Sequence, residues 1–195
     1  MIVIGVLNLQ GAVSEHYGIT KKAIKNLNIN AEVKSVRYAD EVAECDGIII
    51  SGGESTVIGK IITRRGIDKT IKEKKIPVFG TCAGMVLLAK KTNFDQELLG
   101  IMDIEVIRNS YGRQVDSFEK KIKFLDRDFF GVFIRAPSLK DYDESKKDIE
   151  ILSEFNNEII AIKQGCNIAI SFHPELTDDT FIHEYFIKEV LKCVE

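Results

Sequence analysis

The sequence lacks the features of a membrane protein and of a nucleic-acid-binding protein. No apolar run approaches the roughly 20 residues that a transmembrane helix needs. The apolar opening, residues 1–7, has no basic lead-in and is followed by the polar Asn8, which is typical of a buried strand rather than of a signal peptide. The formal net charge is only -3, so there is no basic footprint for DNA or RNA. These absences predict a cytoplasmic protein that binds neither membrane nor nucleic acid.

Cysteine is scarce and irregularly spaced. The four cysteines, Cys45, Cys82, Cys166 and Cys193, lack the paired spacing of a zinc site. A chain of this length can also build a core without disulfide staples. We therefore expect no metal site and no cofactor, and we expect reduced thiols at Cys45, Cys166 and Cys193.

No linker, repeat or low-complexity tract divides the 195 residues. Hydrophobic residues make up 45% of the chain and charged residues 29%, which is ordinary for a soluble globular protein with one substantial core. We expect a single domain over residues 1–195, with the polar stretch 140–148 as an exposed loop. The composition by itself does not indicate a function.

Apolar runs alternate with helix-like stretches through the first half of the chain. Such alternation predicts a parallel sheet with helices on both faces, which is a three-layer αβα architecture. The expected strands are residues 1–7, 31–36, 47–50 and 77–79, and the expected helices are 14–27, 56–74 with a break at Gly66, and 83–91.

The second half of the chain predicts strands joined by short turns. Short spacers connect antiparallel neighbours, so we expect a mixed, mostly parallel sheet with an added antiparallel portion. The expected strands are residues 101–108, 121–124, 131–134, 149–155, 159–164 and 168–172, followed by a final helix over about 178–193.

Cys82 lies at the junction of a predicted strand and a predicted helix, inside Gly80-Thr81-Cys82-Ala83-Gly84. Glycines on both sides permit the sharp turn that lifts a side chain out of a sheet. Backbone N–H groups at the start of a helix favour a thiolate and can bind an oxyanion. The pentapeptide suits a nucleophile, and by itself it is equally typical of a packing turn with an inert thiol.

His173-Pro174-Glu175 follows an expected strand near the end of the chain. His173 can act as a general base toward a thiol, and Glu175 can orient the imidazole, since residues two apart in a strand share a face. Alone, this tripeptide is more often a surface turn, but beside an elbow cysteine it favours a catalytic relay. His16 and His183 lie in helical stretches flanked by charge, where we expect them to face solvent.

Ligands of open α/β sheets bind at the carboxyl ends of the strands. The elbow, His173 and the loop Gly52-Gly53-Glu54-Ser55 all follow expected strands. The glycine pair is either a plain loop or a place where backbone N–H groups approach a reacting carbonyl oxygen.

The elbow cysteine with a distant His173-x-Glu175 resembles the class I glutamine amidotransferases. Further motifs narrow the resemblance to the glutaminase subunit of the two-component pyridoxal 5'-phosphate synthase, and the similarity runs from the first expected strand to the last helix. The stretches that carry it are residues 9–13, 52–56, 80–84, 108–118, 131–137 and 171–177.

This resemblance implies a class I glutamine amidotransferase-like, flavodoxin-like fold and a reaction. Cys82, His173 and Glu175 would form a triad that hydrolyses L-glutamine to L-glutamate and ammonia through a glutamyl thioester. The N–H groups of Gly53 and Ala83 would hold the oxyanion. The residues that the resemblance places around glutamine are Gly53, Glu54, Ser55, Arg108, Ile134 through its backbone, and Arg135.

Spacing alone would make Arg108 and Arg135 surface salt-bridge partners as readily as substrate ligands. The sequence leaves open which of the two would bind the α-carboxylate of glutamine.

The resemblance also implies a partner that consumes the ammonia. This would be a synthase subunit, a separate (β/α)8 barrel that makes pyridoxal 5'-phosphate (vitamin B6), in a complex of twelve copies of each subunit. The loop Leu9-Gln10-Gly11 is the candidate docking and activation element.

Two alternatives stay open: a peptidase, deglycase or stress-response protein with the same elbow, and a non-catalytic regulatory subunit. The loop at residues 52–55 and the carboxylate of Glu175 argue against the first, and the complete triad argues against the second.

Overall fold

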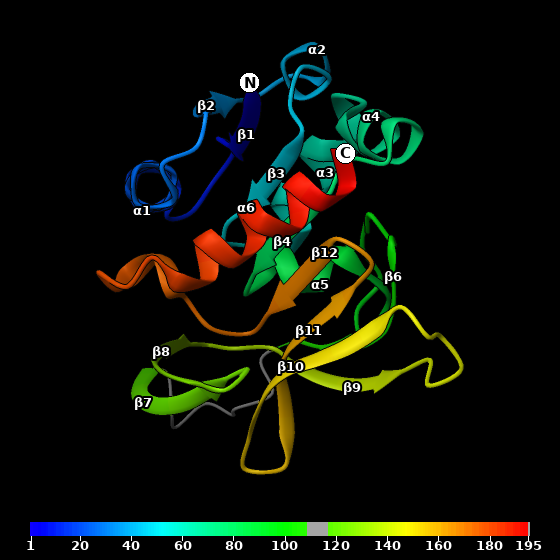
Figure 1. The fold of residues 1–195 in the computed structure, drawn as a ribbon. Coiled ribbons are helices and arrows are strands. Elements are labelled where there is room, and N and C mark those ends of the chain that lie inside the picture. Colours follow the sequence, from blue (N-terminus) through cyan, green and yellow to red (C-terminus); the bar gives the residue numbers. More distant parts are fainter. Residues whose placement is uncertain (109–116, 195) are drawn as a thin grey trace.

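The computed structural model describes residues 1–108 and 117–194, and within them a seven-stranded sheet forms the centre of the molecule (Figure 1). Its strand order is β10-β11-β12-β4-β3-β1-β2. The pairs β1–β2, β1–β3, β3–β4 and β4–β12 are parallel, whereas β10–β11 and β11–β12 are antiparallel. The strands are β1 (Ile2–Leu7), β2 (Ala31–Val36), β3 (Gly47–Ile50), β4 (Val78–Thr81), β10 (Ile149–Phe155), β11 (Glu158–Gln164) and β12 (Asn167–Ile170).

Helices cover both faces of this sheet. Ile48 and Val78 point into one core with α3 (Ser55–Arg64), α4 (Ile67–Lys74) and α5 (Ala83–Leu88). Ile49 and Phe79, their neighbours in the strands, point into a second core with α1 (Val13–Leu27) and α6 (Phe181–Val194). This alternation follows from the two-residue period of a strand. The expected three-layer architecture is confirmed.

The remaining strands form smaller sheets beside the central one. Strand β6 (Met102–Ile107) pairs in parallel with β5 (Ala89–Thr92) and antiparallel with β9 (Ser138–Tyr142). Strands β7 (Ser117–Phe124) and β8 (Arg127–Ile134) form an antiparallel hairpin (Figure 1). The added antiparallel portion expected for the second half is therefore present. Residues 109–116, which belong to the motif at 108–118, lie outside the described residues.

Two expected elements differ from the structure. The helix expected over 83–91 ends at Leu88, and β5 begins at Ala89, because pairing with β6 overrides the helix propensity of this alanine and lysine stretch. The first residues of the loop expected over 140–148 belong to strand β9, which lies at a sheet edge and exposes Lys140 and Asp141. A short helix, α2 (Ala39–Val42), was not expected.

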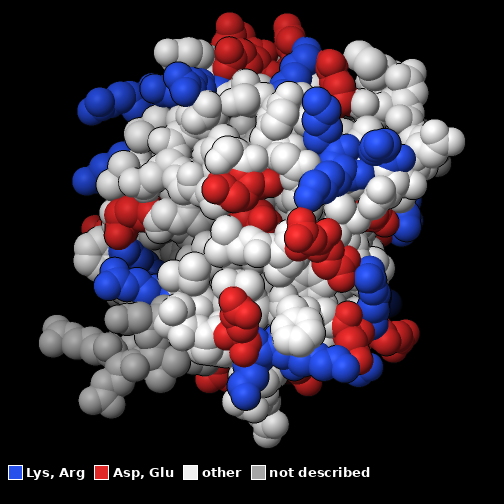
Figure 2. All heavy atoms as spheres, turned by 90° about the vertical axis from the view of Figure 1, so that its left-hand side faces the viewer, with Lys and Arg blue, Asp and Glu red and all other residues white. Residues whose placement is uncertain are grey.

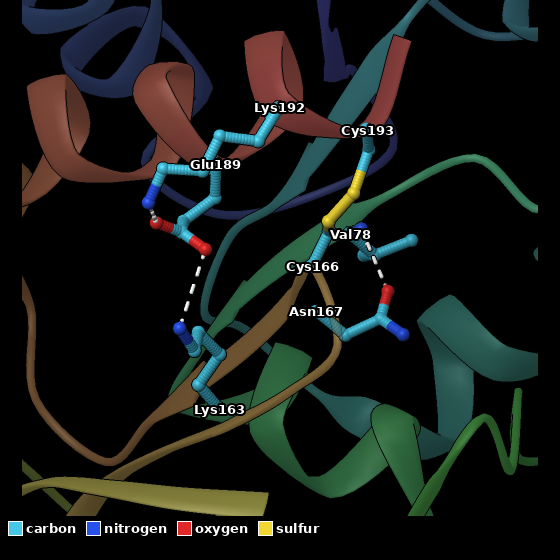
Figure 3. The surroundings of a disulfide bond; sticks show 7 residues. All are labelled: Val78, Lys163, Cys166, Asn167, Glu189, Lys192 and Cys193. Atoms are coloured by element: carbon cyan, nitrogen blue, oxygen red, sulfur yellow. Dashed lines mark hydrogen bonds and ion pairs between the residues drawn. A yellow bond between two sulfur atoms is a disulfide. The ribbon is translucent and has the colours of Figure 1, made fainter. Parts of the chain in front are cut away.

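The expectation of three reduced thiols is wrong for two of them. Cys166 and Cys193 form a disulfide that joins the β11–β12 turn to the end of α6 (Figure 3). The fold brings their Cα atoms to 6.7 Å, within the range that a disulfide spans, although 27 residues separate them in sequence. Cys45 stays free and buried, and burial raises the pKa of its thiol to about 11.

Charged side chains of both signs are interspersed on the face shown in Figure 2. None of the helices in residues 1–108 and 117–194 combines the length and the apolar character that crossing a bilayer requires.

Candidate active site

Cys82 occupies a strained turn between β4 and α5. Its backbone has φ 51° and ψ -103°, a conformation that a residue with a side chain rarely adopts. The Cys82 N–H donates to the carbonyl oxygen of Ile170 at 2.9 Å, and the N–H of Val86 donates to the Cys82 carbonyl oxygen at 3.3 Å. The surrounding sheet and helix therefore hold the elbow in place.

The two glycines of the elbow are required by close backbone approach. A Cβ on Gly80 would lie 2.5 Å from the carbonyl carbon of Gly84, and a Cβ on Gly84 would lie 2.3 Å from the carbonyl oxygen of Ile50. Close packing of β4 and β3 against α5 therefore requires glycine at both positions.

His173 and Glu175 are brought together by a turn and not by a strand. Strand β12 ends at Ile170, and Glu175 lies in a 3-10 helix, η1 (Pro174–Leu176). The expectation that both residues share the face of one strand is wrong, because the strand has ended before His173 and Pro174 begins the 3-10 helix that contains Glu175. The Nδ1–H of His173 donates to Oε1 of Glu175 at 2.7 Å, and the Glu175 side chain is fully buried.

The electrostatics of His173 favour the protonated ring. Burial lowers the pKa of an imidazole, but hydrogen bonds to Cys82 and Glu175 outweigh it here and raise the pKa of His173 to about 10. A ring that keeps its proton at neutral pH is in the state needed to protonate a leaving group.

Cys82 and His173 lie in the wall of one cavity of about 420 Å³. The Sγ atom of Cys82 is 3.8 Å from the carbonyl oxygen of Ile134. Glu175 is the one residue of the predicted site that does not line the cavity, because it lies behind His173. The lining residues are Ala12, Gly53, Glu54, Ser55, Cys82, Ala83, Val86, Arg108, Ile134, Arg135, Pro137, His173 and Leu176.

One wall of the cavity is a network of polar side chains. Nη2 of Arg108 donates to Oε1 of Glu54 at 2.6 Å, and Nη1 of Arg108 and Oγ of Ser55 both donate to Oε1 of Gln96, at 3.1 and 3.0 Å. Burial raises the pKa of Glu54, but hydrogen bonds from Thr56 and the charge of Arg108 outweigh it and leave the pKa below its usual value. Sequence reasoning missed Gln96, which no motif marks.

The glycine loop lies directly against the triad. A Cβ on Gly52 would lie 2.6 Å from Cε1 of His173 and 3.5 Å from Cβ of Cys82. Gly53 has φ 133°, which only glycine adopts readily. The side chain of Gln10 accepts a hydrogen bond from the Glu54 N–H at 2.7 Å, so the loops at 9–11 and 52–54 contact each other.

His16 and His183 do not face solvent as expected. Both are fully buried, and the two rings meet where α1 packs against α6, with Nδ1 of His16 3.0 Å from Nε2 of His183. The charged neighbours misled the prediction, since Glu15 is exposed although the adjacent His16 is buried. The spacing of His16 with Ile19, Thr20 and Ala23 is the signal that could have found the buried face.

Within residues 1–108 and 117–194, no group of three or more His, Cys, Asp or Glu side chains is placed to bind a metal ion.

A mostly parallel αβα sheet that carries a cysteine elbow beside a histidine and a buried carboxylate is a class I glutamine amidotransferase-like arrangement. A solved structure described as a glutamine amidotransferase matches 96% of this chain and 98% of its own with a TM-score of 0.84 at 39% identity. The glutaminase domain of Trypanosoma brucei CTPS with bound acivicin matches 98% of this chain and 94% of its own with a TM-score of 0.64. At 12% identity, that second likeness shows the fold alone.

The chain belongs to the SNO glutamine amidotransferase family, whose model matches residues 6–192. The pyridoxal 5'-phosphate synthase subunit PdxT of Methanobrevibacter smithii is 75% identical over 195 residues, covering 100% of both chains. The protein of the same name from Pyrococcus furiosus is 44% identical over 98% of this chain and 100% of its own. The family resemblance noted from the motifs is confirmed.

Proposed function

We propose that this chain is the glutaminase subunit of a pyridoxal 5'-phosphate synthase, acting as one domain over residues 1–195. It hydrolyses L-glutamine to L-glutamate and ammonia and passes the ammonia to a synthase subunit. The observation that carries the proposal is the cavity in which Cys82 lies next to a His173 ring hydrogen-bonded to buried Glu175. The description of the matching family supports glutamine as the substrate, and the names of the relatives over the whole chain support the pathway.

The chemistry begins with attack of the Cys82 sulfur on the side-chain amide carbon of glutamine. The N–H groups of Ala83 and Gly53 bind the oxyanion, and loss of one such donor costs about a hundredfold or more in rate. His173 transfers its proton to the departing nitrogen, and ammonia leaves a glutamyl thioester on the sulfur. The neutral His173 then takes a proton from water, whose oxygen attacks the thioester and releases glutamate, while Glu175 orients the ring.

The cavity wall offers partners for both charged ends of glutamine. Glu54 is the one acidic side chain among the described lining residues, so it suits the α-ammonium group. Arg108 and Arg135 line the same cavity and suit the α-carboxylate. The carbonyl of Ile134 and the hydroxyl of Ser55 complete the polar contacts that we propose for the substrate.

The ammonia requires a protein partner, because free ammonia is protonated and diluted in water. The proposed partner is the (β/α)8 synthase barrel, assembled as twelve copies of each subunit. Gln10 supports a docking role for the loop at 9–11, since its side chain contacts the backbone of Glu54 beside the proposed oxyanion donor Gly53. A partner that moves this loop would change the oxyanion site directly.

The test is glutamate release from glutamine, measured with and without the synthase subunit. We expect substantial release only with the partner, and we expect Cys82→Ala to abolish it. Cys45→Ala is the matched control, because Cys45 is also a free thiol but lies buried in the core away from the cavity. Activity that survives Cys82→Ala would remove the mechanism.

Mass spectrometry of the whole chain with glutamine separates this proposal from other cysteine-elbow hydrolases. A glutamyl adduct on Cys82 supports the glutaminase, whereas cleavage of peptides or glycated amines without that adduct favours the alternative. Absence of any turnover in the complex would favour a non-catalytic subunit.

A further inference from the structure

A buried polar cluster continues from Glu175 into the core, and the mechanism above does not use it. Oε1 of Glu175 accepts from His173, but Oε2 makes no well-aligned hydrogen bond within the described residues. Oε2 lies 3.3 Å from Nε2 of His16, a distance that allows a hydrogen bond once the two groups align. His16 belongs to α1 and is fully buried.

The second nitrogen of His16 meets another buried histidine. Nδ1 of His16 is 3.0 Å from Nε2 of His183 in α6, while Nε2 of His16 is also 3.2 Å from the hydroxyl of Thr81, next to the elbow cysteine. Nδ1 of His183 has no partner within the described residues. Burial lowers the pKa of both rings, so each carries one N–H at neutral pH.

The contacts select one arrangement of these protons. If His16 carries its proton on Nε2, that N–H faces Thr81 and the Glu175 carboxylate, and His183 donates from Nε2 to Nδ1 of His16. The unpaired atom is then Nδ1 of His183, which carries a lone pair and no proton. The opposite arrangement turns a lone pair of His16 toward the carboxylate and leaves a buried N–H of His183 without an acceptor, which is the rarer and costlier defect.

We propose that His16 is a positioning residue of the catalytic site: its Nε2–H holds the second oxygen of Glu175, so that Oε1 stays in line with Nδ1–H of His173. His183 holds His16 in the required tautomer. The inference rests on the proposed function, and His16 itself does not line the cavity. Among the described residues, the titratable groups that face Glu175 are His173, which immediately precedes η1, and His16 from α1, and His183 from α6 faces His16.

The two nitrogens of His16 can be tested separately by amide substitutions. Gln carries its amide at about the reach of the histidine Nε2, and Asn carries its amide at about the reach of Nδ1. In the complex with the synthase subunit, we expect His16→Leu and His16→Asn to lower kcat for glutamine by roughly tenfold to a hundredfold with little change in KM. We expect His16→Gln to restore most of the loss.

The pH dependence of iodoacetamide alkylation at Cys82 gives a readout that does not depend on glutamine. A loosely held Glu175 stabilises the His173 imidazolium less, so the pH at which His173 loses its proton, seen as the alkaline limb of the alkylation profile, should lie below that of the wild type in His16→Leu and His16→Asn. His16→Gln should keep the wild-type profile.

Phe79→Leu is the matched packing control. Phe79 packs edge-on against both rings, with centroid distances of 6.2 Å to His16 and 5.5 Å to His183, and its removal leaves a cavity without removing a polar atom. We expect it to lower Tm while kcat and the alkylation profile stay unchanged.

Equal kcat and equal alkylation profiles for His16→Gln and His16→Asn would overturn the inference, and this comparison stands even if His16→Leu fails to fold. Failure of the proposed function has a different signature, since the wild-type complex would then release no glutamate. The alkylation profiles would still test the positioning of Glu175 in that case.

Discussion

At the scale of the residue, the site depends on three side chains whose states are set by their neighbours. Cys82 is held at a positive φ by the elements on either side of it. His173 is charged because Glu175 and Cys82 outweigh the cost of burial. Glu175 in turn is buried against His16. The backbone conformation of Cys82, the charge of His173 and the burial of Glu175 therefore all depend on the residues packed around them.

Substitution of Glu175 by Gln tests this coupling. The folded-state pKa of His173 is raised from 6.5 to about 10, so its contribution to stability is fully present below pH 6.5 and is lost as the pH rises toward 10. Glu175→Gln removes one cause of the raised pKa, so we expect a smaller loss of unfolding free energy between pH 6.5 and 10. We also expect kcat for glutamine to fall by about a hundredfold or more.

Urea denaturation across this pH range measures the first effect, and glutamate release in the complex measures the second. An unchanged pH dependence of stability in Glu175→Gln would show that Glu175 does not hold the proton on His173.

At the scale of the element, the elbow works because β3, β4 and α5 approach closely enough to exclude a side chain. Gly84 contacts the last residue of β3, and Gly80 contacts Gly84. The same closeness places the start of α5 and the glycine loop after β3 around one cavity. The geometry of the site is therefore a property of how the elements pack.

Gly84→Ala should separate α5 from β3. Its Cβ would meet the backbone oxygen of Ile50 at 2.3 Å, so we expect a loss of about 1–3 kcal/mol in unfolding free energy, together with a loss of glutaminase activity. Gly18→Ala is the matched control, because Gly18 lies exposed in α1 with no atom within 4 Å of the new Cβ. That change should stabilise the chain by about 0.5–1 kcal/mol. Thermal unfolding that ranks the two variants equally would contradict the packing account.

At the scale of the whole molecule, the disulfide joins two segments at the opposite end of the central sheet from the cavity. Cys166 precedes β12, whereas the catalytic turn follows β12. The end of α6 is thereby tied to the sheet beside the ion pairs of Glu189 with Lys163 and Lys192 (Figure 3).

Removal of this disulfide should cost stability and spare catalysis. A link across 27 residues lowers the entropy of the unfolded chain, so we expect Cys193→Ser to lower the unfolding free energy by about 3 kcal/mol, with kcat unchanged. Reductant should lower the Tm of the wild type and leave the Tm of the variant unaffected. A wild-type Tm that ignores reductant would exclude a stabilising disulfide.

Part of the candidate site was predictable from short motifs, whereas Arg108, Ile134 and Arg135 were predicted only from the family resemblance. Strand period, glycine spacing and the residues after each strand are local signals, and they led to Cys82, His173 and the loop at 52–55. Gln96 and the η1 turn were not predictable in this way, and the burial of His16 was indicated only by its helical spacing with other buried residues of α1. Gln96 joins the site through its hydrogen bonds with Ser55 of α3 and with Arg108, which directly follows β6.

The sequence by itself determined the alternation of strands and helices, the elbow and the identity of the groups available for chemistry, because these depend on residues that are neighbours in the chain. The tertiary structure alone decided which histidines meet, which cysteines are joined and which side chain we propose to support Glu175. Burial and pairing depend on which segments meet in space, and α1, α6 and the β11–β12 turn meet only in the folded molecule.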